Sequence, residues 1–157
     1  PHGAFAAGDA LSIARANGLA RVLDGFYAEL AAHAEPKCKP IGTPPSLADN
    51  VVLVVSGDTF KTPFNRNGWG DGTPGQANVF YVRSNGYLQP GWFGGVSENG
   101  RTNFDPMTGA PSATTLPAAS TAAAQLGILF AIARGDTAAV AKASTAPYTG
   151  LIAPTLP

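Results

Sequence analysis

This 157-residue chain has few charged residues: Asp, Glu, Lys and Arg together make up 13 per cent, against the roughly 25 per cent of typical domains. Ten basic residues balance ten acidic ones. Proteins that bind nucleic acid gather Lys and Arg to neutralise phosphates, and a neutral chain this poor in both offers no such surface. The composition predicts no nucleic-acid partner, and it fits an exported protein or one that another chain largely covers.

Cysteine and long apolar runs are also scarce. Cys38 stands alone, so the sequence provides neither an internal disulfide nor a second thiol for a redox or zinc motif. We interpret it as a lone loop thiol, with pairing to a cysteine of another chain as the alternative. The longest apolar candidate, Leu126–Ala133, is far shorter than the roughly 18 residues of a membrane helix, so no membrane span is predicted.

What the chain does contain is enough apolar sequence for a core, since hydrophobic residues make up 45 per cent. Apolar residues recur with helical period over residues 8–34 and again over residues 118–134. Gly135 is a natural stop for the second helix, and Asp136 is a suitable cap for a short final helix, Thr137–Ala143. The sequence therefore predicts three helices.

Strand signals lie between the two long helices. Val51–Val55 is a β-rich apolar run without alternation, which is typical of a strand buried on both faces, and residues 78–83 form a second candidate. Residues 87–96 fit a short strand or an ordered loop, and the polar segment 98–117 is expected to be irregular. The proline-containing tail is expected to be extended.

This order of elements predicts an α/β fold with a partial parallel sheet and flanking helices. A parallel sheet normally has more strands than the few found here. Residues 1–157 are therefore expected to form either a single domain or the C-terminal half of a larger α/β domain. The start at Pro1 instead of Met fits a processed product or a piece of a longer chain.

The stretch with the strongest site signal begins in the first predicted strand, which runs into Ser-Gly-Asp and then a loop rich in Asn, Gly and Asp. Sites in open α/β sheets lie beyond the carboxyl ends of strands, which makes Asp58 the best candidate for a metal ligand or an acid–base group. The alternative is a turn residue that binds backbone amides. Ser56 lacks the G-x-S-x-G pattern of a nucleophile elbow.

Four segments taken in order carry a resemblance to a known family: FYAELAAH, DNVVLVVSGDTFKTPFNRNG, ANVFYVRSNGYLQPGWFGG and LFAIARGD. Together they resemble the C-terminal part of exported proteins of the alkaline-phosphatase and sulfatase superfamily. The chain is most similar to the domain-of-unknown-function family fifteen-zero-one, whose members usually carry a twin-arginine export signal. The resemblance covers nearly the whole chain. It implies an alkaline-phosphatase-like C-terminal portion, exported to the periplasm or beyond.

The resemblance also implies a metal site. Asp58, Thr62-Pro63, Asn67-Gly68 and Asp71 follow the order of the family motifs, and His2 fits the end of an upstream Asp-Thr-His motif. Asp58, Asp71 and His2 are therefore the predicted metal ligands, for a divalent ion such as zinc, manganese or calcium. In such proteins the nucleophile and further ligands belong to the N-terminal half.

The chain departs from the family pattern by lacking two histidines. Thr59 follows Asp58 and Gly72 follows Asp71, at places where active members carry His. Zinc prefers imidazole or thiolate along with carboxylate, so the predicted metal centre is an eroded one. No cofactor is assigned with certainty on these residues.

Two further interpretations concern neighbouring residues. Asn65, Asn67 and Asp71 supply alternating oxygen ligands beside Gly, as a calcium loop does, but Asn65 and Gln76 stand where an EF-hand has acidic residues. Aromatic residues near Gly-rich turns form a candidate face for sugar or polymer binding, or else ordinary core packing: Trp69, Tyr81, Tyr87, Trp92 and Phe93.

Three functions follow. The first is a non-catalytic structural or binding relative of the superfamily, acting with another protein chain or with an N-terminal half. The second is a metal-dependent hydrolase of phosphate or sulfate esters, whose nucleophile lies outside this chain and whose site Asp58 and Asp71 complete. The third is a carbohydrate-binding module. Whether the protein is an enzyme is left open at this point.

Overall fold

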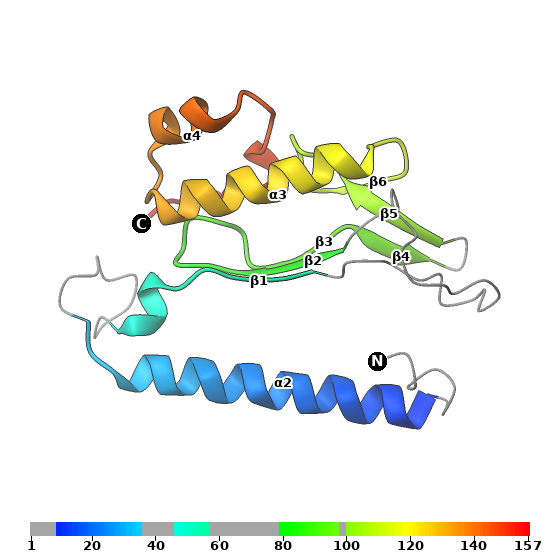
Figure 1. Cartoon of the computed structure of the whole chain (residues 1–157), viewed down its shortest axis with the longest axis vertical. Helices are drawn as coiled ribbons and strands as arrows, with labels where there is room; N and C mark the ends of the chain where they lie inside the picture. Colours follow the sequence, from blue (N-terminus) through cyan, green and yellow to red (C-terminus); the bar gives the residue numbers. More distant parts are fainter. Residues whose placement is uncertain (1–8, 36–45, 57–78, 98–99) are drawn as a thin grey trace. The chain divides into compact units, whose positions relative to one another are not determined.

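The structure, a computed structural model, describes residues 9–35, 46–56, 79–97 and 100–157. The chain divides into two compact units, Pro1–Asn50 and Val51–Pro157. Helices and antiparallel sheets occur together, so the fold is mixed α and β (Figure 1).

The first unit is built on one long helix. The helix expected over residues 8–34 is confirmed as α2, Asp9–Ala32, and a short 3-10 helix follows as η1, Leu47–Asn50. The Leu47 N–H donates to the His33 carbonyl at 2.9 Å, which ties the start of η1 to the end of α2. The Asp49 carboxylate accepts from the Ser46 N–H at 2.8 Å and so caps η1.

The second unit contains a first antiparallel sheet of three strands in the order β1–β2–β3. Its strands are β1, Leu53–Ser56; β2, Phe80–Arg83; and β3, Gly91–Phe93. The parallel sheet predicted from the sequence is therefore wrong. Only a short turn joins β2 to β3, with Gly86 at φ 89°, and parallel neighbours need a crossover of a dozen residues or more.

A second antiparallel sheet follows in the segment that was expected to be irregular. Its strands are β4, Gly95–Ser97; β5, Gly100–Phe104; and β6, Pro111–Ser112. The irregular assignment of residues 98–117 is wrong for the strands β5 and β6, because the Asp, Pro and Gly residues between these two strands form a hairpin turn. Between β5 and β6 the Asp105 N–H donates to the Ala110 carbonyl at 2.8 Å, which closes the turn.

The two helices expected after these strands are confirmed. They are α3, Pro117–Ile132, and α4, Thr137–Ala143. Gly135 ends α3 at φ +83°, and its N–H donates to the Phe130 carbonyl at 2.9 Å. The Asp136 side chain accepts from the N–H groups of the first turn of α4, as its predicted role as cap requires.

The core of the second unit lies between α3 and the first sheet. Figure 1 shows α3 running along one face of that sheet. Side chains from both elements meet there in one buried cluster, which includes Phe80, Val82, Phe93, Leu126 and Phe130. Small residues on α3, such as Ala123, allow the helix to approach closely.

The tail is packed and only partly extended, which corrects the prediction. Residues Thr149–Leu151 form the 3-10 helix η2, and Leu151 is fully buried. The Ala153 N–H donates to the Tyr87 carbonyl at 3.0 Å, and Leu88 pairs with Ile152 in an isolated bridge. Apolar Leu and Ile residues between the prolines account for this docking, because their burial stabilises the tail against the core.

No helix within the described ranges combines the length and apolar character needed to cross a membrane.

Candidate functional site

The predicted metal ligands are not among the described residues. His2, Asp58 and Asp71 all lie outside them, and so do the calcium-loop candidates and Cys38. Within the described part of the chain, no three His, Cys, Asp or Glu side chains gather closely enough to hold a metal ion. The metal site therefore stays a prediction.

The aromatic residues proposed as a binding face separate into two groups. Tyr87 and Phe93 are both 5 per cent exposed and belong to the core. Tyr81 and Trp92 lie together elsewhere, and Trp69 is outside the described residues. Because successive side chains of a strand point to opposite faces, Phe93 enters the core while Trp92 faces away from it.

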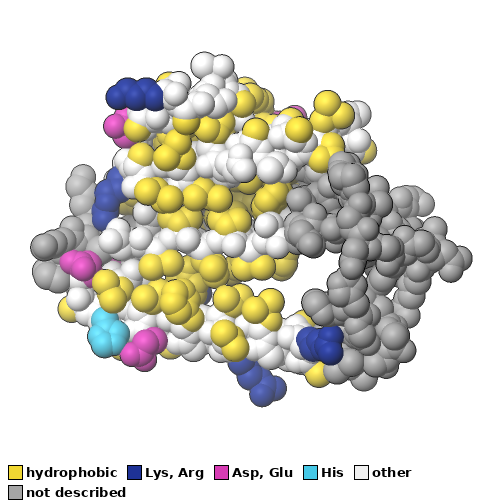
Figure 2. Space-filling view, in the orientation of Figure 1, with side chains coloured by type: hydrophobic (Ala, Val, Ile, Leu, Met, Phe, Trp, Pro, Cys, Tyr) yellow, Lys and Arg dark blue, Asp and Glu magenta, His cyan; other side chains and the backbone are white. Residues whose placement is uncertain are grey.

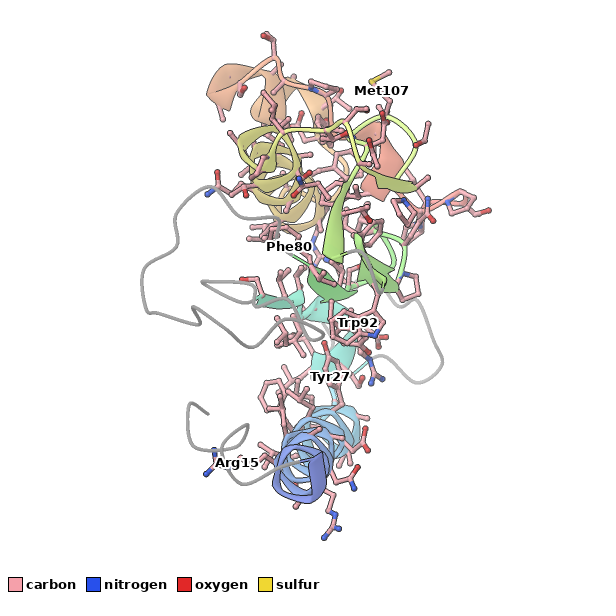
Figure 3. All side chains as sticks on the ribbon, turned by 90° about the vertical axis from the view of Figure 1, so that its right-hand side faces the viewer. Arg15, Tyr27, Phe80, Trp92 and Met107 are labelled. Atoms are coloured by element: carbon pink, nitrogen blue, oxygen red, sulfur yellow. The ribbon has the colours of Figure 1, made fainter. Side chains whose placement is uncertain are left out.

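Tyr81 and Trp92 are direct cross-strand partners in the β2–β3 pair. Their ring centroids are 5.2 Å apart and the ring planes are tilted by 55°. Trp92 is nevertheless 69 per cent exposed, so Tyr81 covers only one side of the indole. In Figure 3, Phe80 and Trp92 lie on opposite sides of the sheet, in agreement with the strand register.

The sheet register groups further residues around this aromatic pair. Leu53 is opposite Arg83, and Val55 is opposite Tyr81. We call this side of the sheet the Trp92 face, and it consists of Leu53, Val55, Tyr81, Arg83 and Trp92. Its strands place alternate residues on the core side, where Val52 and Val54 pack against the buried cluster.

The Trp92 face is apolar with one charge. Leu53, Val55 and Tyr81 are partly buried, whereas Arg83 and Trp92 are exposed. Arg83 is the single charged residue among these five. Charged side chains are also few on the side of the molecule that Figure 2 draws, in keeping with the composition.

Side chains of these kinds bind by stacking and hydrogen bonding. The indole and phenol rings present flat apolar surfaces, and the Arg83 guanidinium adds donors in a fixed fork. The five residues contain no carboxylate, imidazole or thiol that could act as a general base or nucleophile. The arrangement suits recognition of a partner surface.

Sequence reasoning found Tyr81 and Trp92 but missed Leu53, Val55 and Arg83. A usable signal was present in FYVR, where apolar and polar-tipped residues alternate with period two. That pattern separates Tyr81 and Arg83 from Phe80 and Val82. The partners in β1 could not be assigned, because the run Val51–Val55 has no alternation from which to choose a face.

Comparison with protein-family models, curated proteins and solved structures finds no match to this chain.

Proposed function

We propose that this protein is a non-catalytic binding protein that holds another polypeptide against the Trp92 face. The observation that carries the proposal is the exposure of Trp92 beside Tyr81 on an ordered sheet. The Trp92 indole is 69 per cent exposed, and a partner that removed it from water would stabilise the complex.

The composition of the face supports a protein partner. Trp, Tyr and Arg are the residue types that contribute most binding energy at protein–protein interfaces, and this face carries one of each. Leu53 and Val55 extend the apolar surface beside them. Because Trp and Tyr side chains have only two rotatable torsions, they lose little conformational entropy on binding for the area they bury.

The family resemblance supports the same kind of function. If the chain is an alkaline-phosphatase-like C-terminal portion of an exported protein, Thr59 and Gly72 replace the expected imidazole groups. A relative that keeps the fold and lacks the full ligand set would act through its surface. The hydrolase alternative remains a proposal on Asp58, Asp71 and His2, and it predicts that Asp58→Ala abolishes esterase turnover without unfolding the protein.

The test compares partner retention by immobilised Trp92→Ala and the unmodified chain, using extracts of the cells that produce it. We expect Trp92→Ala to raise the dissociation constant of a partner that the unmodified chain retains by about 30-fold or more, which corresponds to roughly 2 kcal/mol of binding free energy. Leu116→Ala is the matched control, because Leu116 is 71 per cent exposed outside this face. Equal retention by all three proteins would overturn the proposal.

A carbohydrate is the second candidate partner, and the tilted Tyr81–Trp92 pair favours it. Two adjacent rings on a strand surface offer stacking area to a sugar ring. Titration of tryptophan fluorescence with soluble glucans and with chitin oligomers separates this function from the first. A saturating change that Trp92→Ala abolishes would favour the carbohydrate.

A further inference from the structure

The strand β1 carries a sequence that does not match its place in the sheet. The run Val51–Val55 is apolar at every position, as in strands covered on both faces and paired at both edges. Among the described residues β1 pairs only with β2, so it lies at an edge of the sheet that these residues form. Residues Val51 to Val55 are all only partly buried.

Edge strands in natural proteins usually carry features that prevent pairing with another chain. Lys or Pro on the strand, a bulge or a very short length are the common ones. The β1 sequence Leu-Val-Val-Ser has no charge and no proline. Alternate residues of β1 direct their N–H and C=O groups away from β2, and these groups can pair with an added strand.

The opposite edge of the same sheet provides the contrast. β3 has three residues, Gly91–Phe93, and Pro90 precedes it. Gly91 and Gly94 adopt φ of +127° and +92°, which interrupts the extended backbone at both ends of the strand. Both edges are short, but only the β3 edge has a proline beside it and a backbone interrupted by glycines of positive φ, which are features that protect an edge.

We infer that β1 pairs in antiparallel fashion with β1 of a second copy of this chain. The free backbone groups of an edge require a strand as their occupant, and β1 is complementary to itself. Depending on the register, its pairing partners would be Val, Leu or Ser56, and Val is a residue type that strands favour. The formal net charge of zero gives two copies no overall repulsion.

The symmetry of this dimer fixes the placement of the two Trp92 faces. Two identical antiparallel edges that join into one flat sheet are related by a two-fold axis perpendicular to that sheet. The axis leaves the sides of the sheet unexchanged, so both Trp92 faces lie on the same side. The dimer offers a six-stranded surface with two aromatic pairs, one from each copy. The inference stands on the β1 edge and does not depend on the proposed function.

Sedimentation velocity of the whole chain over a hundredfold range of concentration tests the dimer. We expect a reversible dimer whose dissociation constant rises at least tenfold in Leu53→Lys and in Val55→Lys. Both residues lie on the Trp92 face and not on the core side, so a lysine there can extend to water. Ile132→Lys, at a position 64 per cent exposed on α3, is the matched control and should dimerise as the unmodified chain does.

Three results would overturn the inference: a monomer at every concentration, a dimer that tolerates both lysines, or a dimer equally weakened by Ile132→Lys. If the lysine variants fail to fold, single cysteines at positions 53 to 56 in a Cys38→Ser background replace them. Antiparallel pairing predicts intermolecular disulfides at the residue nearest the axis and none at its neighbours on the opposite face. Uniform or absent cross-linking contradicts it.

Trp92→Ala should leave the dimer intact, so failure of the proposed function and failure of this inference are distinguishable.

Discussion

Gly109 and Gly150 lie backbone against backbone, although one belongs to the turn between β5 and β6 and the other to η2. The Gly150 N–H donates to the Pro106 carbonyl at 2.9 Å, which fixes η2 against that turn. A Cβ on Gly150 would collide with the Gly109 nitrogen and lie 2.7 Å from backbone atoms of Thr108. The contact thus anchors the tail of the chain to the second sheet.

Gly150→Ala is expected to destabilise the second unit by about 1–3 kcal/mol, because backbone atoms cannot move aside as a flexible side chain can. Urea unfolding followed by tryptophan fluorescence measures the change. Gly109→Ala should cost at least as much, since Gly109 also has a φ of +75°. Unchanged stability in Gly150→Ala would show that the tail does not pack against this turn.

Ser120 links α3 to β5 through a buried hydrogen bond. Its hydroxyl donates to the Phe104 carbonyl at 2.9 Å, and both residues have no exposed surface. Ser120→Ala leaves that carbonyl without this donor and should cost about 1–3 kcal/mol. Ser144→Ala is the control, because its hydroxyl accepts from the Ala146 N–H at an exposed site, where the loss is expected to be much smaller. Similar costs at the two sites would contradict the assignment.

The helices could be predicted closely because their signals are local. Asp136 and Gly135 mark the two sides of one boundary, and both act in the structure as their chemistry requires. Strand direction is not local. Val51–Val55 has the composition of a central parallel strand, yet nothing in a single strand specifies whether its neighbour runs parallel or antiparallel.

The candidate site was predictable only in part, because some of its features are local in the sequence and others depend on strand pairing. Trp92 and Tyr81 could be named as aromatic residues near a glycine-rich turn, but their pairing follows from the β2–β3 register, which joins residues across a turn. The separation of Trp92 from Phe93 follows from strand alternation once β3 is known. Asp58 and Asp71 stay predictions from the sequence alone.

Gly18 and Gly25 weaken α2 without a packing role among the described residues. A Cβ at either position would meet no described atom within 4 Å. Gly18→Ala and Gly25→Ala should each stabilise the helix by about 0.5–1 kcal/mol. Amide hydrogen exchange over α2 measures this locally. Faster exchange in either variant would indicate that the added methyl group collides with a neighbouring part of the protein.

Asp105 gives the second unit a pH-dependent contribution to its stability. Its carboxylate accepts from the Thr108 N–H at 2.9 Å and from the Met107 N–H at 2.8 Å. These bonds hold the pKa of Asp105 below its usual value of 3.8, and the bond from Thr108 has the largest effect. Since the pKa is lower in the folded than in the unfolded chain, the contribution is complete above about pH 4 and is lost as the pH falls through the folded-state pKa.

Asp105→Asn removes the titrating group from this turn and should flatten that part of the stability profile. We expect the unmodified chain to be more stable than Asp105→Asn at pH 7, and the difference to shrink as the pH falls below about 4, because protonation removes the charge that strengthens both hydrogen bonds. Urea unfolding at intervals across this range measures it. Asp24→Asn on α2 is the control, since Asp24 is exposed and lies in the other unit. A difference between the unmodified chain and Asp105→Asn that stays constant down to pH 2 would mean that the carboxylate charge does not stabilise the turn.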